Sequence, residues 1–139
     1  AAALTQQQLD QTSNPMDQLR EYLLVSLQIF RETPEFARFY LQFYYLSGFD
    51  DRIKELNTSI KNRAVTRIHG ILARAKEQGR LRDDLDVNKA AKTIHNCLTG
   101  VLINSVTEFP QFTDSQLLNS LETIIEYGVF QRERSRLDA

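Results

Sequence analysis

Few side chains in this sequence carry reactive or metal-binding chemistry, and their spacing does not suit it. His69 and His95 are far apart, so a zinc site would need both to converge with a carboxylate across different helices. Cys97 lies two residues after His95, and side chains two apart on a helix point in different directions, so they do not form a nucleophile–base pair. Each histidine instead lies beside an apolar stripe, as interior or pocket histidines do.

The acidic pairs Asp50-Asp51 and Asp83-Asp84 fall at expected helix boundaries, where capping and the helix dipole explain them. The sequence has no glycine-rich phosphate loop, no paired cysteine spacing and no His-Glu-x-x-His helix. We therefore predict no catalytic residue, no metal ion and no cofactor, and we expect the protein to act by binding other molecules.

Length and composition favour one globular domain over residues 1–139. The chain has 42% hydrophobic and 25% charged residues, close to the globular average. With 17 basic against 18 acidic residues the net charge is -1, which gives no sign of the basic face that binds DNA. No apolar run approaches the ~18 residues of a membrane span, and the start lacks signal-peptide features. Cys97, in an apolar stretch, is expected to be buried, as fits a reducing cytoplasm.

Glycine and proline are sparse, and they fall where helices should begin or end. Gly48 can take the left-handed conformation that ends a helix, and Gly79 should end the longest one. Thr113 with Gln116 forms a capping box before the last helix. No alternating pattern indicates a strand, so the sequence predicts an all-α antiparallel bundle of about five to six helices. After a partial first helix at about 1–11, helices are expected at 16–31, 34–47, 51–78, from 87 up to Phe109-Pro110, and from about 114 through 129.

The helix at 34–47 is unusually rich in aromatic residues, which cover most of its circumference. One interpretation is a plain aromatic core. The other is a cavity lined by rings with a few polar tips, the usual character of a small-molecule pocket. The aromatic residues are Phe36, Phe39, Tyr40, Phe43, Tyr44 and Tyr45.

The last two helices, within 86–132, carry more apolar surface than one stripe, and small residues on them allow close approach of backbones. Two such helices from each of two subunits can form a four-helix bundle across a twofold axis. The alternative is an intramolecular hairpin packed on the preceding helices. For a homodimer, the predicted interface residues are Leu98, Val101, Leu102, Ser105, Leu121, Ile124, Ile125 and Gly128.

Several stretches resemble the carboxy-terminal part of TetR/AcrR-type transcriptional regulators. The segment Ile71-Leu72-Ala73-Arg74-Ala75-Lys76-Glu77-Gln78-Gly79-Arg80-Leu81-Arg82-Asp83-Asp84-Leu85-Asp86 carries the likeness, followed by Ala90-Ala91 and Leu98-Thr99-Gly100-Val101-Leu102. The entry Asn14-Pro15-Met16-Asp17-Gln18-Leu19-Arg20 is also similar. The likeness spans Asn14 to about Phe130.

This resemblance implies an effector pocket in the helices of 15–80, dimerisation through the last two helices, and a DNA-binding helix-turn-helix domain before residue 1. No helix-turn-helix signature lies in this chain, so DNA recognition is assigned to none of its residues. We hypothesise that a small lipophilic or aromatic effector moves the first helix as a lever and so alters the spacing of two DNA-reading heads. A helical protein-interaction module and a small helical enzyme remain alternatives. The predicted effector contacts are Phe39, Tyr40, Phe43, Tyr44, His69 and Asn96.

Overall fold

A computed structural model describes residues 14–109 and 112–130, and over these residues the chain is all-α, as predicted. No strand lies in this part of the chain; its one β-type contact is an isolated bridge between Leu81 and Phe130. The expected partial helix at 1–11 falls outside the described residues. The five helices are α2 (Pro15–Glu32), α3 (Pro34–Leu46), α4 (Asp51–Glu77), α5 (Val87–Thr107) and α6 (Asp114–Val129).

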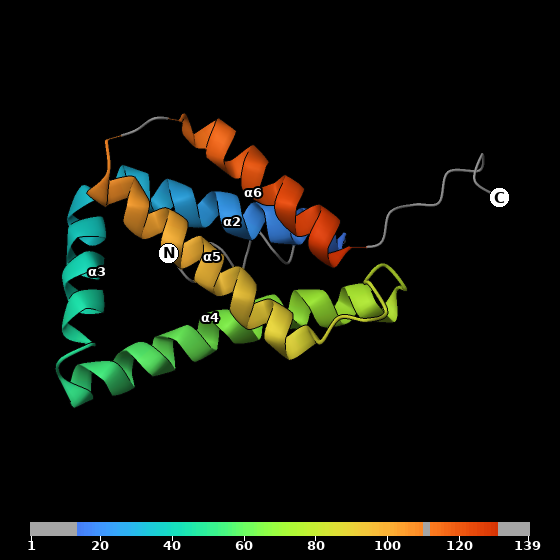
Figure 1. The fold of residues 1–139 in the computed structure, drawn as a ribbon, viewed down its shortest axis with the longest axis horizontal. Coiled ribbons are helices and arrows are strands. Elements are labelled where there is room, and N and C mark those ends of the chain that lie inside the picture. The colour runs from blue at the N-terminus through green and yellow to red at the C-terminus, as the bar shows by residue number, and fades with distance from the viewer. Residues whose placement is uncertain (1–13, 110–111, 131–139) are drawn as a thin grey trace.

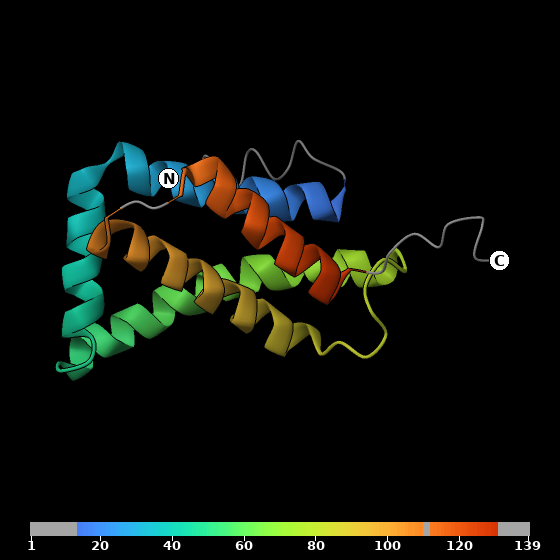
Figure 2. The same cartoon turned by 45° about the horizontal axis from the view of Figure 1, so that its top comes forward.

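The helices form an open frame that is crossed by α5. Figure 1 shows α3 standing at one end of the molecule, with α2 and α4 leaving its two ends in the same general direction. Helix α5 crosses this frame and packs mainly on α4, whereas α6 packs on α2. The turned view of Figure 2 keeps α3 at that end and α6 beside α2. Three helices, α3, α4 and α5, therefore contact one another around the corner where α4 begins.

The helix starts follow the capping chemistry expected from the sequence. Asn14 Oδ1 accepts a hydrogen bond from the backbone N–H of Met16 at 2.9 Å. The capping box of α6 is complete, because Gln116 donates its N–H to Thr113 Oγ1 and Thr113 donates its N–H to Gln116 Oε1, at 3.2 and 2.9 Å. Each contact satisfies a backbone N–H that the helix itself leaves unpaired.

The two glycines expected to end helices behave differently. Gly79 takes the left-handed conformation, with φ of 69°, and Arg80 donates its N–H to the carbonyl of Ala75, a Schellman ending. The same expectation for Gly48 is wrong, because Gly79 is the only glycine with positive φ. After α3 the chain keeps a right-handed turn, in which the N–H groups of Phe49 and Asp50 both donate to Leu46.

The core lies where α2, α4 and α5 meet, with α6 closing one side. Leu23 of α2 and Ile68, Ile71 and Leu72 of α4 are completely or almost completely buried. Burying a leucine or isoleucine side chain stabilises the fold by about 1.5–3 kcal/mol. The core therefore uses the second half of α4, and the first half of this long helix is left to form other surfaces.

Two further features bear on the sequence predictions. The segment after α4 is fixed to the end of α6, since Leu81 is buried and Arg82 donates its N–H to the Val129 carbonyl at 3.1 Å. Cys97 is exposed at the edge of the core stripe of α5, so the prediction of a buried thiol is wrong. No helix in the described ranges is long and apolar enough to cross a membrane.

Candidate functional site

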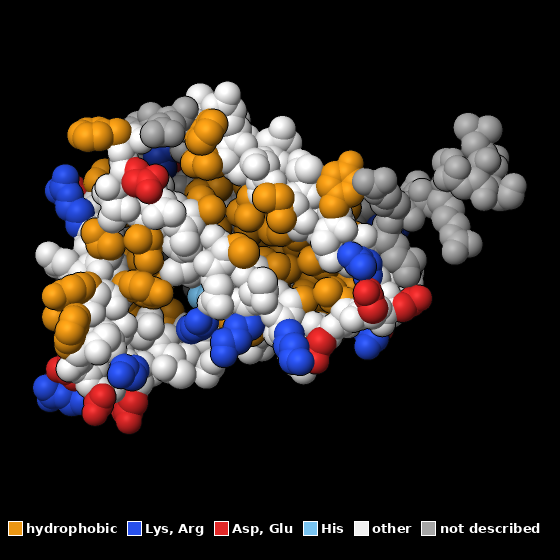
Figure 3. Space-filling model, in the orientation of Figure 1, with side chains coloured by type: hydrophobic (Ala, Val, Ile, Leu, Met, Phe, Trp, Pro, Cys, Tyr) orange, Lys and Arg blue, Asp and Glu red, His pale blue; other side chains and the backbone are white. Residues whose placement is uncertain are grey.

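A cavity of about 590 Å³ opens between α3, α4 and α5. Small-molecule pockets have volumes of roughly 300–1,000 Å³, so this cavity has the right size for one. In Figure 3 the surface is hollowed beside the hydrophobic side chains that gather over α3, and a histidine is visible inside the hollow. The lining residues are Tyr40, Tyr44, Ser47, Gly48, Lys54, Asn57, Ile60, Lys61, His95, Asn96, Thr99, Gly100 and Ile103.

The structure brings three of the six predicted effector contacts together in this cavity. Tyr40 and Tyr44 enter from α3, and Asn96 enters from α5. Phe39 and Phe43 are not part of the lining; they stack on each other, with ring centroids 6.1 Å apart, and Phe39 is 62% exposed. His69 is also outside the lining, near the core half of α4.

Apart from Asn96, sequence reasoning did not include among the effector contacts the polar residues that α4 and α5 contribute to the cavity. Lys54, Asn57 and Lys61 follow one another at spacings of three and four, so they share one face of α4. The sequence does show this spacing, but polar residues three and four apart on an amphipathic helix are equally expected on a face exposed to solvent. His95 also lines the cavity, as expected of a pocket histidine, although the predicted effector contacts named His69 instead.

Thr99 contacts two titratable side chains of the cavity, His95 and Tyr40. Its Oγ1 lies 3.3 Å from His95 Nε2. Burial raises the pKa of the Tyr40 phenol, and a hydrogen bond with Thr99 partly opposes this effect. Burial, followed by the charge of Lys61, lowers the pKa of His95 from its ordinary value of 6.5. Both groups are therefore uncharged at neutral pH, and they present hydrogen-bonding groups without charge to the cavity.

The lowered pKa of His95 makes the fold less stable in mild acid. Below pH 6.5 the unfolded chain takes up a proton on His95 that the folded chain resists, because burial and the charge of Lys61 disfavour the protonated ring. His95 Nδ1 is buried and has no hydrogen-bond partner among the residues that the structure describes. The free energy of unfolding should therefore fall as the pH drops below 6.5. Urea unfolding of the wild type and of His95→Gln at pH 7.5 and 5.5 measures this: the variant should lose less stability between the two values. An equal loss in both proteins would contradict the assignment.

The predicted dimer residues divide into two groups. Leu98, Leu102, Leu121 and Ile125 are buried inside the chain and belong to its core. The others include Ser105 and Gly128, which are exposed, and Val101, which is half-buried. Ile124 is 68% exposed, a large fraction for an isoleucine in the middle of a helix.

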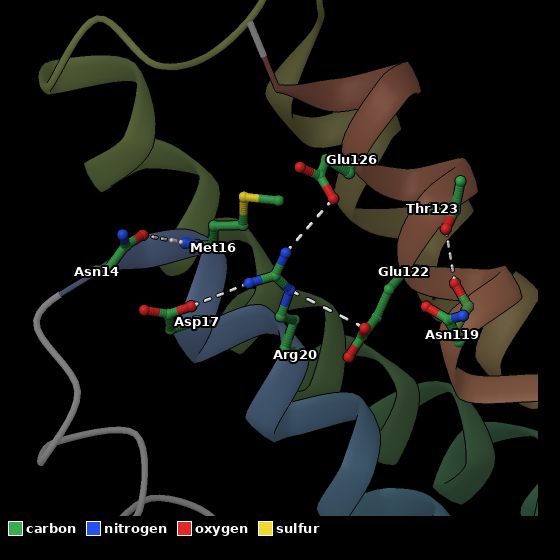
Figure 4. A network of polar contacts seen from close by, with 8 residues as sticks. All are labelled: Asn14, Met16, Asp17, Arg20, Asn119, Glu122, Thr123 and Glu126. Carbon is green, nitrogen blue, oxygen red and sulfur yellow. Dashed lines mark hydrogen bonds and ion pairs between the residues drawn. The ribbon is translucent and has the colours of Figure 1, made fainter. Parts of the chain in front are cut away.

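Helix α6 is held on α2 by an arginine. The guanidinium group of Arg20 forms ion pairs with one carboxylate on its own helix and two on α6 (Figure 4). Its Nη1 lies 3.2 Å from Asp17 Oδ1, its Nη2 lies 3.4 Å from Glu126 Oε2, and its Nε lies 4.0 Å from Glu122 Oε2. An exposed ion pair contributes only about 0.2–1 kcal/mol. Ile125 and Leu121, which belong to the apolar core, therefore contribute more to the packing of α6 than the ion pairs of Arg20 do.

Comparisons with known proteins agree with the architecture. The ketosteroid transcriptional regulator KstR2 of Mycobacterium tuberculosis has a similar fold, with a TM-score of 0.65 at 19% identity. The alignment covers 94% of this chain and 65% of that chain, so this chain spans less than the full regulator. No curated protein sequence matches significantly.

A family match confirms the resemblance to the carboxy-terminal part of TetR-type regulators that residues 71–86 carry, and the similarity of fold agrees with it. Residues 15–127 match the family described as "BetI-type transcriptional repressor, C-terminal". The chain belongs to this family of C-terminal domains of transcriptional regulators. Within residues 14–109 and 112–130, no three His, Cys, Asp or Glu side chains are grouped so that they could hold a metal ion.

Proposed function

We propose that this chain is the effector-binding and dimerisation domain of a ligand-responsive repressor, and that the effector binds in the cavity between α3, α4 and α5. The observation that carries the proposal is the cavity itself, whose volume of about 590 Å³ is not filled by the aromatic side chains of α3. Tyr40 and Tyr44 supply an apolar wall with polar tips, the usual character of a small-molecule pocket.

Helix α4 provides a route from the cavity to the rest of the chain. Its first half lines the cavity through Lys54 and Ile60, and its second half packs in the core through Ile68 and Leu72. An effector that fits one position of α3 and α4 better than another shifts the population toward that position. In the complete protein, such a shift would reach a helix-turn-helix domain outside this chain and change DNA binding.

We further propose that two chains associate through the exposed faces of α5 and α6. Figure 3 shows hydrophobic side chains gathered between these two helices and along α6. Large apolar side chains exposed there include Val106, Phe109, Ile124 and Tyr127. Apolar surface of this kind is the usual mark of an interface between subunits.

A side chain added at Gly100 tests the cavity directly. Gly100 lines the cavity, and a Cβ built there meets no atom within 4 Å. The side chain of Gly100→Leu therefore enters the cavity without a clash, and leucine stabilises a helix relative to glycine by roughly 0.5–1 kcal/mol. We expect the variant to raise the dissociation constant of the neutral dye N-phenyl-1-naphthylamine by about tenfold or more, a loss of at least ~1.4 kcal/mol. Fluorescence titration gives both constants.

Gly70→Leu is the matched control. Gly70 is also in a helix with open space beside it, but it is exposed on α4 and does not line the cavity. The control should gain the same helix stability and bind the dye as the wild type does. Unchanged dye binding by Gly100→Leu, or equal losses in both variants, would rule out this cavity as the site.

A further inference from the structure

The charged side chains that line the cavity are all basic. Lys54 and Lys61 both line it, and none of its lining residues is an aspartate or a glutamate in the part of the chain that the structure describes. His95 adds hydrogen-bonding capacity without a charge at neutral pH, because its pKa is lowered. Positive charge on this wall is therefore not balanced from inside the cavity.

The two lysines differ in whether a carboxylate of the protein already neutralises their charge. Lys54 Nζ lies 4.0 Å from Asp51 Oδ1, one turn earlier on α4, so its charge is partly balanced in the free protein. Lys61 lies two turns after Lys54 and is partly buried, and no described carboxylate forms an ion pair with it. Its charge reaches into the cavity wall, since it is one of the two causes that lower the pKa of His95. Lys61 is thus the cation available to a ligand.

The remaining walls are suited to an apolar body. Tyr40 and Tyr44 stack with ring centroids 6.2 Å apart and nearly parallel planes, which gives α3 a continuous aromatic wall. Ile60 of α4 and Ile103 of α5 also line the cavity. An aromatic wall on one side and a cationic group on another match a molecule with an apolar ring or chain and an acidic group.

We infer that the effector is an organic anion, with its apolar body against Tyr40 and Tyr44 and its carboxylate, sulfonate or phosphate group at Lys61. This inference rests on the proposed function and adds the charge of the ligand to it. A hydrogen bond to a charged group is stronger than one between neutral groups, so an acidic group at Lys61 adds affinity that a neutral ligand lacks. A cation in the same position would instead meet the positive charges of Lys54 and Lys61.

The test compares two dyes with the same skeleton, of which one carries a sulfonate: 8-anilinonaphthalene-1-sulfonate and the neutral N-phenyl-1-naphthylamine. Lys61→Met keeps an unbranched apolar side chain that is one atom shorter, and it removes the charge. We expect this variant to raise the dissociation constant of the sulfonate dye by about tenfold and to leave that of the neutral dye unchanged. Dividing the dissociation constant of the sulfonate dye by that of the neutral dye, for each variant, removes any effect of the substitution on the binding of the shared apolar skeleton.

Two variants serve as controls for this ratio. Lys61→Arg keeps the charge and should keep the wild-type ratio. Lys76→Met removes a lysine near the other end of α4, where the side chain is exposed and does not line the cavity, and it should also keep the wild-type ratio. Together they separate the charge at position 61 from the net charge of the protein.

Failure of the inference is distinguishable from failure of the proposed function. In one outcome, both dyes bind, Gly100→Leu weakens the binding of both, and Lys61→Met leaves the ratio of their dissociation constants unchanged. The cavity is then the binding site, and the inference of an anionic ligand is wrong. If neither dye responds to Gly100→Leu, the cavity is not the site and both proposals fall. A ratio that changes in Lys61→Met but equally in Lys76→Met would also overturn the role of Lys61.

Discussion

Replacing Leu72 with alanine is expected to lower the free energy of unfolding by about 2–5 kcal/mol, because leucine-to-alanine changes in a packed core lose both apolar burial and a filled cavity. Leu72 has no exposed surface and lies among α2, α4 and α5, whose contact forms the core. Domains of this kind have only about 5–15 kcal/mol of stability in total. Urea unfolding followed by circular dichroism should therefore show a large decrease in the midpoint.

Leu56→Ala is the matched control for this change. Leu56 is also a leucine of α4, but it is about half exposed in the half of the helix that borders the cavity. We expect its replacement to change the free energy of unfolding by less than about 1 kcal/mol, as surface substitutions do. Similar losses for Leu56→Ala and Leu72→Ala would show that the core is not concentrated in the second half of α4.

Replacing Ile124 with glutamate is expected to weaken the proposed dimer by about a hundredfold or more, as the loss of a central apolar contact does. The new carboxylate would be buried at the interface without a partner, which adds to the cost. The fold should survive, since Ile124 is largely exposed within one chain and glutamate is a good helix former. Sedimentation equilibrium of the wild type and the variant gives the two dissociation constants.

Leu56→Glu places the same charge on an exposed apolar position of α4, which is not part of the proposed interface, and this variant should dissociate as the wild type does. A wild-type dissociation constant in the Ile124→Glu variant would exclude α6 as the contact, and a monomeric wild type would exclude the dimer. Variants of Leu98 or Ile125 are unsuitable for this purpose, because both side chains are buried in the core of the single chain.

The sequence was sufficient to predict the helices, because their signals are local. Proline after a capping residue at Asn14-Pro15, the capping box at Thr113 and the glycine at 79 each act on backbone groups within one turn, and all three form as expected. Gly48 is the exception. A glycine permits the left-handed conformation without requiring it, and the turn from α3 to α4 is closed by right-handed hydrogen bonds instead.

The site was predicted less completely because it depends on how three helices approach one another. Aromatic residues on every side of α3 did not show which ring faces α4, and the structure turns Tyr40 and Tyr44 inward and leaves Phe39 exposed. From the sequence alone, Lys61 is expected to face solvent, because only the packing of α3 and α5 beside α4 makes its position part of a cavity. Likewise, Leu98 and Ile125 are apolar enough for a dimer interface, but α2 and α4 already cover them within the chain.

The exposed position of Cys97 gives the protein a built-in point for spectroscopic labelling. It is the one cysteine of the sequence, and it follows Asn96, which lines the cavity. A maleimide fluorophore or a nitroxide therefore attaches at one defined place on α5 of this chain. In the symmetric dimer that we propose, two nitroxides at Cys97 define a single distance between the two α5 helices. Pulsed electron paramagnetic resonance measures this distance with and without a ligand, and no engineered substitution is needed in this chain.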